Sequence, residues 1–468
     1  MNANERTGQI PDHINGGPTK RFFVSMLTRD IELDDAILDL IDNCVDGAMR
    51  LNPGKKGSPD PFRNFEAKIT LKRTEFEISD NCGGIPFDQF EDAFSLGRPK
   101  LDKDNDVPTI GMYGIGMKRA IFKIAHSATV SSVHTELAVS VDYSRTWLDP
   151  DNKEWDLPVE KILNPPKKMG VTVRSKDLLE DIGRHFANDA FINKLTLKIG
   201  EHFGYIIQKG FTIKLNGVPV RAVTLPLRSS DFSKLPSIRA FDFHAKIGDV
   251  DVDVKIGFFR SLVLEKEIDE ETLSSTGREQ AGISVICNDR VVLLHDRTIK
   301  TGWGDGGVPQ FHPQFRAIAG LVILASNNAQ QLPLSTTKRD LDVGSDVFLT
   351  VRQACIEGIK IFTNFTNAWK GMETEAAEFF EQAPQKDARR GIQLARDHGM
   401  AVRGMPNAKK YRPVLPTPGS KTKRRISFIR ELTDIEAVSL SLFGEKDVRP
   451  SEVGDACFSR TLNEANNV

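Results

Sequence analysis

The chain has 468 residues and a formal net charge of -1 at neutral pH, and hydrophobic residues make up 39% of it. This length is enough for two or three domains, and the near-zero charge excludes a globally basic nucleic-acid-binding protein. The five cysteines lie far apart without a CxxC pair, which argues against a zinc site and a disulfide scaffold. The polar N-terminus and the lack of a long apolar run predict a soluble cytoplasmic protein with no membrane partner.

The segment 33–49 has the apolar periodicity of a helix and carries a cluster of polar residues. At 100° per residue, Asp39, Asp42, Asn43 and Asp46 fall within about a quarter of the helix circumference. No Lys or Arg lies among them, so the carboxylates repel one another. Mg²⁺ takes oxygen ligands and would relieve this repulsion. The segment therefore predicts a magnesium site, and a solvated acidic face is the alternative interpretation.

Segments 67–72 and 75–79 alternate apolar and polar residues, as half-buried antiparallel strands do. The second segment runs directly into the sequence Asp80-Asn-Cys-Gly-Gly-Ile. The two glycines permit a sharp turn, which leaves the Asp80 carboxylate at the end of a strand and close to any ligand. An Asp before a Gly pair is common at strand ends, so this Asp is informative through its spacing after the acidic helix.

A glycine-rich segment precedes the next predicted helix, which spans 119–125. Its sequence is Gly111-Met-Tyr-Gly114-Ile-Gly116-Met-Lys118. Glycines at the start of a helix let a phosphate approach the free N–H groups there, and Lys118 would add a full positive charge. Neither the P-loop pattern nor the Rossmann GxGxxG is present. A glycine-rich turn without a ligand is the alternative interpretation.

The remaining pattern divides the chain into four parts. After the third motif, strand-like segments are followed by a helical region, 177–203. Asn216-Gly217 then marks a hairpin. We expect a first domain to end near residue 225, and a strand-rich second domain to end in a helix at 347–368. The predicted parts are an N-terminal arm (1–20), a first domain (21–225), a second domain (226–370) and a C-terminal tail (371–468).

The tail begins with a polar helix and continues as a Pro-interrupted basic linker, 409–425. Its basic residues and Tyr411 predict either contact with nucleic-acid phosphates or a solvated linker, and both interpretations stay open. Apolar residues from Ile429 to Phe443 recur at helical spacing. They predict an amphipathic helix that docks on the body of the protein or on a protein partner.

Taken in order, the three polar segments resemble the motifs of the GHKL superfamily of ATPases, which includes gyrase B, Hsp90, MutL, histidine kinases and MORC proteins. The superfamily pattern is E-x-x-D-N on a helix, D-x-G-x-G after a strand and G-x-x-G-x-G-x-K before a helix. Here the motifs begin at Asp39, Asp80 and Gly111. The chain looks most similar to MORC-like and MutL-like prokaryotic ATPases, over its first half.

This resemblance implies an α+β protein, with a Bergerat-type ATPase α/β sandwich, a transducer domain of the ribosomal-S5 type and a short C-terminal tail. ATP and Mg²⁺ are the implied ligands. Asn43 would bind the metal, Asp80 would accept a hydrogen bond from the adenine amino group, and Asp39 would orient or deprotonate the attacking water. Lys338 is the candidate sensor of the γ-phosphate. The residues assigned to nucleotide binding are Asn43, Asp46, Asp80, Gly84, Ile85, Gly111, Tyr113, Gly114, Ile115, Gly116, Met117, Lys118 and Thr172.

Three positions depart from the superfamily pattern. Asp39 stands where the superfamily has Glu and is one methylene shorter, so the water must sit closer or turnover is slow. Cys82 replaces the first Gly of the second motif. Val171 takes the place of the strand Thr that usually completes the adenine site. Thr172 is therefore the candidate there, although one residue along a strand reverses the face.

The resemblance implies an ATP-gated switch. Mg·ATP binds, the glycine-rich lid and the N-terminal arm order, two protomers form a homodimer, and slow hydrolysis resets them. DNA transactions and bacterial anti-phage defence are the settings that the resemblance implies. The alternatives are a nucleotide-dependent scaffold and an Hsp90-like chaperone, both with negligible turnover.

Overall fold

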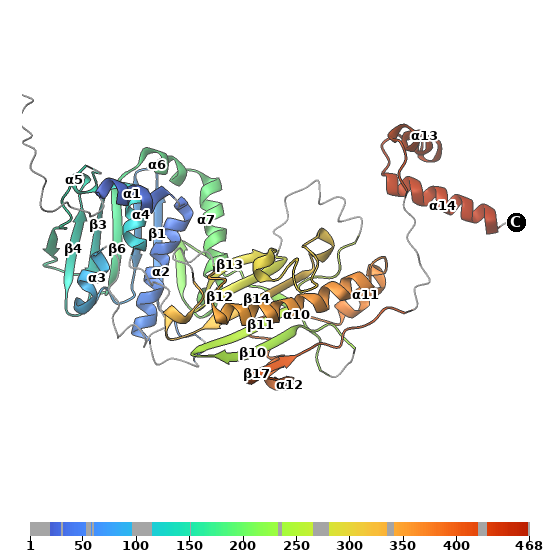
Figure 1. Cartoon of the computed structure of the whole chain (residues 1–468). Helices are drawn as coiled ribbons and strands as arrows, with labels where there is room; N and C mark the ends of the chain where they lie inside the picture. Colours follow the sequence, from blue (N-terminus) through green and yellow to red (C-terminus); the bar gives the residue numbers. More distant parts are fainter. Residues whose placement is uncertain are drawn as a thin grey trace, which may run out of the picture. The chain divides into compact units, whose positions relative to one another are not determined.

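The computed structural model describes residues 19–29, 31–52, 58, 60–95, 115–149, 151–232, 236–264, 280–334, 341–419 and 428–466. The chain divides into two compact units, Met1–Thr417 and Pro418–Val468. The first unit contains two large β-sheets, each with its own helices and apolar core (Figure 1). Within the described ranges, no helix is both long and apolar enough to cross a membrane.

The first sheet has eight strands, and every neighbouring pair is antiparallel except β1 and β7. In spatial order the strands are β5 (Val159–Lys161), β4 (Ala138–Tyr143), β3 (Ala125–Val133), β6 (Gly170–Leu178), β2 (Glu75–Asp80), β1 (Glu66–Lys72), β7 (Thr212–Leu215) and β8 (Val218–Pro219). Strands β1 and β2 confirm the two that the alternating pattern predicts. The predicted hairpin is also confirmed, because Asn216 and Gly217 join β7 to β8 with φ of 49° and 83°.

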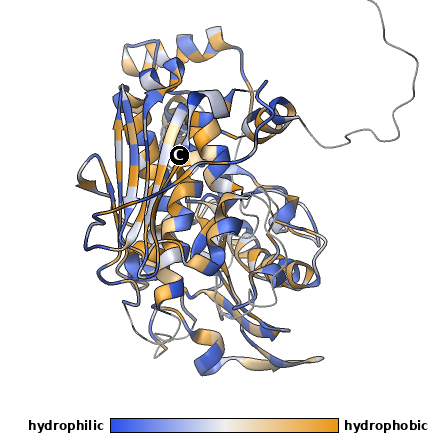
Figure 2. Cartoon of the chain, turned by 90° about the vertical axis from the view of Figure 1, so that its left-hand side faces the viewer, coloured by the Kyte–Doolittle hydropathy of each residue, from blue (hydrophilic) through white to orange (hydrophobic). Residues whose placement is uncertain are grey.

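The helices of this region are α1 (Lys20–Arg29), α2 (Leu33–Leu51), α3 (Phe90–Phe94), α4 (Gly116–Ile124), α5 (Arg145–Leu148), α6 (Glu180–Phe186), α7 (Asp189–His202) and α8 (Gly204–Gln208), with a 3₁₀ turn, η1 (Phe87–Gln89). Helices α2 and α4 confirm the helices predicted over the first and third motifs. They pack against each other and bury apolar side chains together with β1 and β3. Figure 2 shows hydrophilic and hydrophobic residues interspersed along the helices and strands.

The second sheet has seven strands. In spatial order they are β13 (Arg290–Asp296), β12 (Gly282–Cys287), β14 (Ile318–Ala325), β11 (Val250–Phe258), β10 (Phe241–Ile247), β17 (Met405–Tyr411) and β16 (Met400–Val402). The long helix α10 (Asp346–Ala368) packs on β11, β10 and β14 and confirms the helix predicted at 347–368. It begins where the Ser345 hydroxyl accepts a hydrogen bond from the Phe348 N–H at 3.2 Å.

Smaller elements complete the first unit. They are a two-stranded sheet of β9 (Pro226–Arg228) and β15 (Gln385–Asp387), the helices α11 (Glu373–Glu381) and α12 (Leu394–His398), and the 3₁₀ turns η3 (Ile299–Thr301), η4 (Pro313–Phe315) and η5 (Ala329–Gln331).

Strands on either side of residue 371, the predicted start of the tail, pair with each other. Strand β17 pairs with β10, and β15 pairs with β9, so the chain as far as Thr417 is part of the first unit. Sequence composition could not reveal this, because both strands are short and polar.

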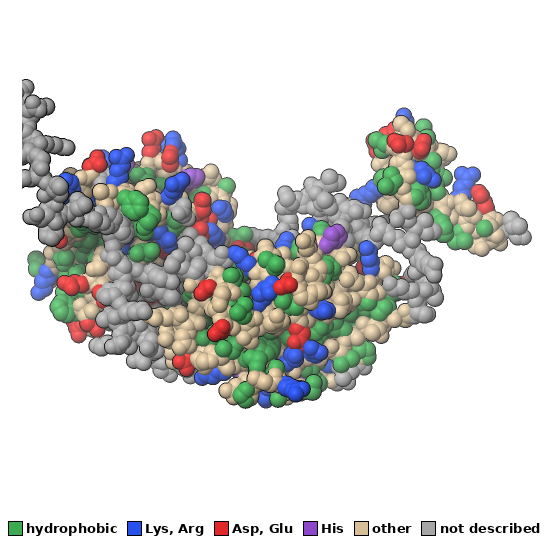
Figure 3. All heavy atoms as spheres, viewed as in Figure 1, with side chains coloured by type: hydrophobic (Ala, Val, Ile, Leu, Met, Phe, Trp, Pro, Cys, Tyr) green, Lys and Arg blue, Asp and Glu red, His purple; other side chains and the backbone are tan. Residues whose placement is uncertain are grey.

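The first part of the predicted basic linker is therefore a strand. Lys410 makes a salt bridge of 2.9 Å with Glu357 of α10, and Arg412 binds the same carboxylate. On the face seen in Figure 3, basic and acidic side chains are intermixed over the first unit. The remaining basic residues, Lys421 to Arg425, lie outside the described residues.

The second unit contains the helices α13 (Leu432–Phe443) and α14 (Pro450–Asn466). Helix α13 confirms the predicted amphipathic helix, although Ile429 lies before its first residue. Apolar residues of this unit face solvent, with Leu432 67% and Phe458 57% exposed. Docking of this unit on a protein partner stays a prediction.

Candidate functional site

The predicted acids Asp39, Asp42 and Asp46 of α2 are buried, which corrects the alternative of a solvated acidic face, and two of them pair with arginines. Asp39, Asp42 and Asp46 are each less than 9% exposed, whereas Asn43 is exposed. Asp39 forms an ion pair with Arg119 of α4, and Asp42 accepts a hydrogen bond from Arg290 Nε of β13 at 2.8 Å. The cations that balance these acids come from distant parts of the chain, so the local sequence could not show them.

Asn43 is the residue of this set that α2 presents to solvent. No group of three or more His, Cys, Asp or Glu in the described ranges could hold a metal ion alone. Mg²⁺ is usually bound through one or two protein oxygens, substrate phosphates and waters, so a lone exposed carboxamide fits this metal when a nucleotide supplies the other ligands. The residues present fit a metal that arrives with its nucleotide.

Asp80 lies at the end of β2, where two backbone N–H groups hold its carboxylate. Oδ1 accepts hydrogen bonds from the Cys82 N–H at 2.8 Å and the Val171 N–H at 3.2 Å. Burial raises the pKa of Asp80, and these hydrogen bonds oppose that rise. The carboxylate is therefore fixed in orientation at the edge of the core, as recognition of one particular donor requires.

Glycines let α2 approach the turn that follows β2. A Cβ on Gly47 would lie 2.8 Å from the Cys82 carbonyl oxygen, so only Gly permits this contact. Gly84 has φ of +71°, and a Cβ there would lie 2.3 Å from the Val133 carbonyl oxygen. The next residue, Ile85, donates its N–H to the Ser132 hydroxyl at 2.9 Å. The first and second motifs are therefore in contact.

The third motif ends in the first residues of α4, which lie beside α2. A Cβ on Gly116 would lie 3.4 Å from Asp39 Cβ. Ile115 and Met117 are half-buried beside it, whereas Lys118 is 1% exposed. Burial lowers the pKa of Lys118 to about 8, against the opposing charge of Asp92. The structure thus places Asp39 beside Gly116 at the N-terminus of α4, and Lys118 is buried in the first turn of the same helix.

The structure does not bring Thr172 to this site. In the register of β2 and β6, Thr172 pairs with Ser79, and Val173 pairs with the buried Ile78. Side chains alternate along strands, so Thr172 lies on the face opposite to Asp80, and Val171 lies on the same face as Asp80. The one-residue offset of this threonine therefore turns its side chain away from Asp80, as the alternation of side chains along a strand predicts.

Four predicted residues lie outside the described residues. They are Gly111, Tyr113, Gly114 and Lys338. The N-terminal arm lies outside as well, apart from Thr19 and Lys20. Lys20 begins α1 and is buried, with Nζ 2.8 Å from the Trp147 carbonyl oxygen.

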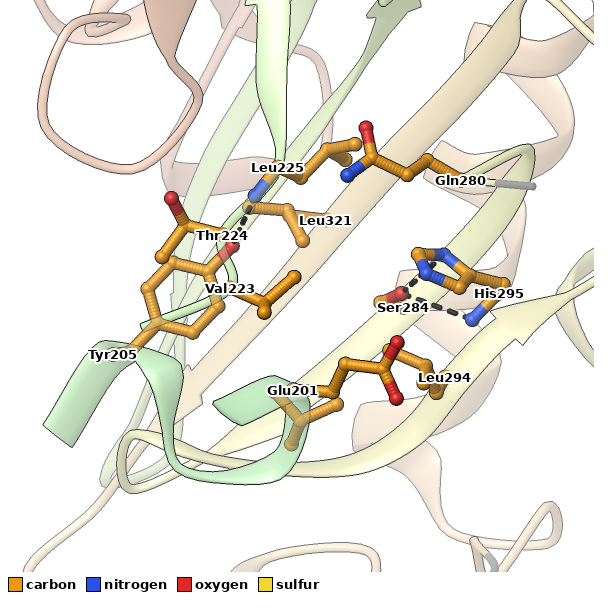
Figure 4. Close-up of a pocket in the computed structure, with 11 residues that line it drawn as sticks. Glu201, Tyr205, Val223, Thr224, Leu225, Gln280, Ser284, Leu294, His295 and Leu321 are labelled. Carbon is orange, nitrogen blue, oxygen red and sulfur yellow. Dashed lines mark hydrogen bonds between the residues drawn. The ribbon is translucent and has the colours of Figure 1, made fainter. Parts of the chain in front are cut away.

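A small cavity lies between the α7–α8 region and the second sheet, and it shares no residue with the predicted nucleotide site (Figure 4). Its lining includes Glu201, Ser284 and His295, which are residue types of a catalytic triad. The Ser284 hydroxyl accepts the backbone N–H of His295 at 3.0 Å and lies 3.4 Å from Nδ1 of that ring. Burial lowers the pKa of His295 to about 4, and Ser284 is 3% exposed. These contacts stabilise a strand pair and do not expose a nucleophile.

Sequence reasoning missed Arg119 and Arg290. Arg119 directly follows Lys118, so placing both on one helix beside α2 would have found it. Arg290 directly precedes the apolar run 291–294, and a charged residue at the edge of such a run is the only signal that the sequence gives.

The first sheet, α2 and α4 form an α/β sandwich that carries the first two motifs and the described part of the third. Residues 31–162 match the family of histidine kinase-, DNA gyrase B- and HSP90-like ATPases. This segment contains all three motifs, the helices α2 and α4, and the strands β1 to β5 of the first sheet. The match supports a GHKL-type ATPase domain with ATP binding as its function. No curated protein matches the chain.

Proposed function

We propose that this chain is a Mg²⁺-dependent ATPase that acts as an ATP-gated dimerisation switch. The observation that carries the proposal is that the elements carrying the three motifs adjoin. A Cβ on Gly47 of α2 would lie 2.8 Å from the Cys82 carbonyl oxygen, and a Cβ on Gly116 of α4 would lie 3.4 Å from Asp39 Cβ. Segments that are separate in the sequence thus pack together, with the Asp80 carboxylate held at the turn after β2 and Asp39 paired with Arg119 of α4.

Each motif has a chemical role in this proposal. Asp80 accepts a hydrogen bond from the adenine amino group, with its orientation held by the Cys82 and Val171 N–H groups. Asn43 contributes an oxygen to Mg²⁺, which bridges the phosphates. Lys118 and the N-terminus of α4 balance phosphate charge. Asp46, Gly84, Ile85, Ile115 and Met117 shape the walls.

Arg119 extends the phosphate site. It is 9% exposed, and its Nε has no hydrogen-bond partner among the described residues. A buried guanidinium N–H without a partner is costly, and a phosphate oxygen would satisfy it. When Arg119 turns toward phosphate, Asp39 is released to orient the attacking water. Turnover is slow in this account, because Asp39 must first leave its ion pair.

The second domain is proposed to act as an S5-like transducer, with Lys338 as the γ-phosphate sensor. Helix α1 supports the dimerisation step, because it follows the N-terminal arm and exposes Phe22 (59%) and Met26 (49%). An ordered arm and this apolar face would together form a surface for a second protomer.

The paired state of Asp39 also favours a second candidate, a nucleotide-dependent scaffold with negligible turnover. Substitution of Asp39 by Asn distinguishes the two. A scaffold with the substitution keeps its function with ATP bound, whereas a cycling ATPase is trapped in the ATP-bound state.

The proposal is tested by size-exclusion chromatography with light scattering, in Mg²⁺ with no nucleotide, ADP or AMP-PNP, together with a phosphate-release assay. A dimer that forms only with AMP-PNP, and slow phosphate release that Asp39→Asn abolishes, are the expected results. A mass that is the same in all three conditions, with no phosphate release, would refute the switch.

A further inference from the structure

Arg290 joins the acidic helix to the second sheet. Arg290, the first residue of β13, donates from Nε to Asp42 Oδ1 at 2.8 Å, and both side chains are nearly inaccessible (6% and 1% exposed). Its guanidinium carbon lies 4.2 Å from the centre of the Phe203 ring. Nη1 donates to the Val291 carbonyl at 2.8 Å. The guanidinium is thus held by a carboxylate, a ring and a carbonyl at once.

The hairpin that carries Arg290 is anchored at its tip. Asn288 and Asp289 form a two-residue turn with φ of 45° and 71°, a geometry typical of tight hairpins. Asn288 donates to the Ser326 carbonyl at 3.1 Å and accepts the Ser326 N–H at 3.0 Å. Asp289 forms ion pairs with Lys209 and Arg389. The position of Arg290 is therefore fixed relative to the second sheet.

Helix α2 carries the proposed metal ligand and the acid that binds Arg290 at adjacent positions. Asn43, the proposed metal ligand, is exposed, and the preceding residue, Asp42, is buried against Arg290. A helix of 19 residues with continuous backbone hydrogen bonds moves as one piece. A shift or rotation of α2 that brings Asn43 to Mg·ATP must displace the Asp42 carboxylate from Arg290 or carry the β12–β13 hairpin with it.

We propose that Arg290 is a positioning residue that couples nucleotide binding at α2 to the second sheet through its ion pair with Asp42. The inference rests on the proposed function, since it needs a nucleotide at Asn43. A buried charge pair has only a narrow range of favourable geometries, because loss of contact leaves both charges without solvent. A small movement of α2 is therefore passed through the ion pair to the β12–β13 hairpin.

Hydrogen–deuterium exchange of the full chain tests this coupling, with and without Mg·AMP-PNP. In the wild-type protein, AMP-PNP is expected to slow amide exchange in Gly282–Asp296 by about fivefold or more, the range of ordinary coupling between sites. Arg290→Met removes the charge and is expected to abolish this change. Coupling is reciprocal, so the same variant should change the affinity for AMP-PNP by a similar factor.

A matched control is Arg389→Met. It removes another ion-paired arginine from the same hairpin tip, where Arg389 binds Asp289 and not α2. This control is expected to lose stability but to keep the AMP-PNP effect on the hairpin. If Arg290→Met does not fold, Arg290→Lys replaces it. Lys keeps the charge but cannot reproduce the guanidinium contacts, so the AMP-PNP effect should fall by more than half.

Three outcomes decide the inference. Loss of the AMP-PNP effect in the Arg290 variant alone supports it. If AMP-PNP slows exchange in the Arg290 variant as much as in the wild-type chain, the coupling role is overturned. It is also overturned if the Arg389 control loses the AMP-PNP effect to the same extent. In both cases the proposed function still stands. Absence of AMP-PNP binding to the wild-type chain overturns both, and calorimetry distinguishes that result from the others.

Discussion

Arg119 of α4 forms a buried ion pair with Asp39 of α2, and this pair links the glycine-rich motif to the acidic helix. The proposed water-orienting carboxylate is therefore covered by a residue of the segment that would close over the phosphates. Binding of a triphosphate gives Arg119 a competing anionic partner. The resulting exchange of partners would make release of Asp39 depend on the nucleotide.

Asp39→Asn is expected to lower the rate of phosphate release by about 100-fold or more, because Asn cannot accept a proton from water. Binding of AMP-PNP should remain. The measurement is single-turnover phosphate release at saturating Mg·ATP. Asp34→Asn is the matched control, since Asp34 is a buried acid of the same helix that pairs with Lys198 instead. Equal turnover in both variants would refute the role of Asp39.

Asn43→Ala is expected to remove the dependence of nucleotide affinity on Mg²⁺. The carboxamide is exposed and fills no core position, so the fold should be unaffected. Titration of AMP-PNP in Mg²⁺ and in EDTA checks the expectation. Wild-type affinity should fall in EDTA, whereas the variant should show one low affinity in both buffers. A variant that still responds to Mg²⁺ would place the metal elsewhere.

The affinity for Mg·AMP-PNP is expected to fall as the pH rises above about 8. Burial lowers the pKa of Lys118 to about 8 in the nucleotide-free chain. A bound phosphate favours the protonated amine and raises its pKa, so binding takes up a proton above that value. The loss should approach about tenfold per pH unit until the bound-state pKa is reached. Lys118→Arg should bind with flat pH dependence over the same range, because Arg stays protonated.

Gly84→Ala is expected to lower the free energy of unfolding by about 2 kcal/mol or more, because strain and a backbone clash combine. The position has φ of +71°, and the new Cβ would lie 2.3 Å from the Val133 carbonyl oxygen. Gly217→Ala separates the two causes, since Gly217 has φ of +83° with nothing within 4 Å. Urea unfolding should show a smaller loss for Gly217→Ala, and equal losses would exclude the clash.

Stability is expected to fall in acid because of His202. Burial lowers the pKa of this ring to about 3, with the nearby charges of Arg290 and Lys198 adding to the effect and that of Asp42 opposing it. The unfolded chain binds a proton below about pH 6.5, whereas the folded chain does so only near pH 3, so stability is lost as the pH falls through that window. The loss is about 3–5 kcal/mol for a full shift.

His202→Asn checks this assignment. The Asn amide can replace the Nδ1 donor that lies 2.8 Å from the Val291 carbonyl, but it does not titrate. Urea midpoints between pH 7 and pH 4 should therefore depend less on pH in the variant than in the wild-type chain. An unchanged slope would assign the acid sensitivity to other groups.

The three motifs and the elements that carry them could be predicted from local sequence. Alternating polarity predicts β1 and β2, helical periodicity predicts α2 and α4, and Asn216-Gly217 predicts a hairpin. Each of these signals depends on a few neighbouring residues and on backbone geometry alone. The face of Thr172 follows from the same rule, because the period of two along a strand holds in β6.

The charge balance of the site could not be predicted in this way. Asp42 and Arg290 are 248 positions apart, and no local pattern joins them. The acids of α2 therefore look unpaired in the sequence although the fold pairs them. The strands β15 and β17 were missed for a related reason. Their polar residues give no strand pattern, and they form strands because their backbones pair with β9 and β10.

Titration calorimetry of the full chain with Mg·AMP-PNP and Mg·GMP-PNP tests the central claim most directly. We expect one AMP-PNP to bind per protomer and GMP-PNP to bind much more weakly. Asp80→Asn should abolish this preference, since the carboxylate that accepts the adenine amino group is lost. No heat with either nucleotide, or equal affinity for both in the wild-type chain, would contradict it.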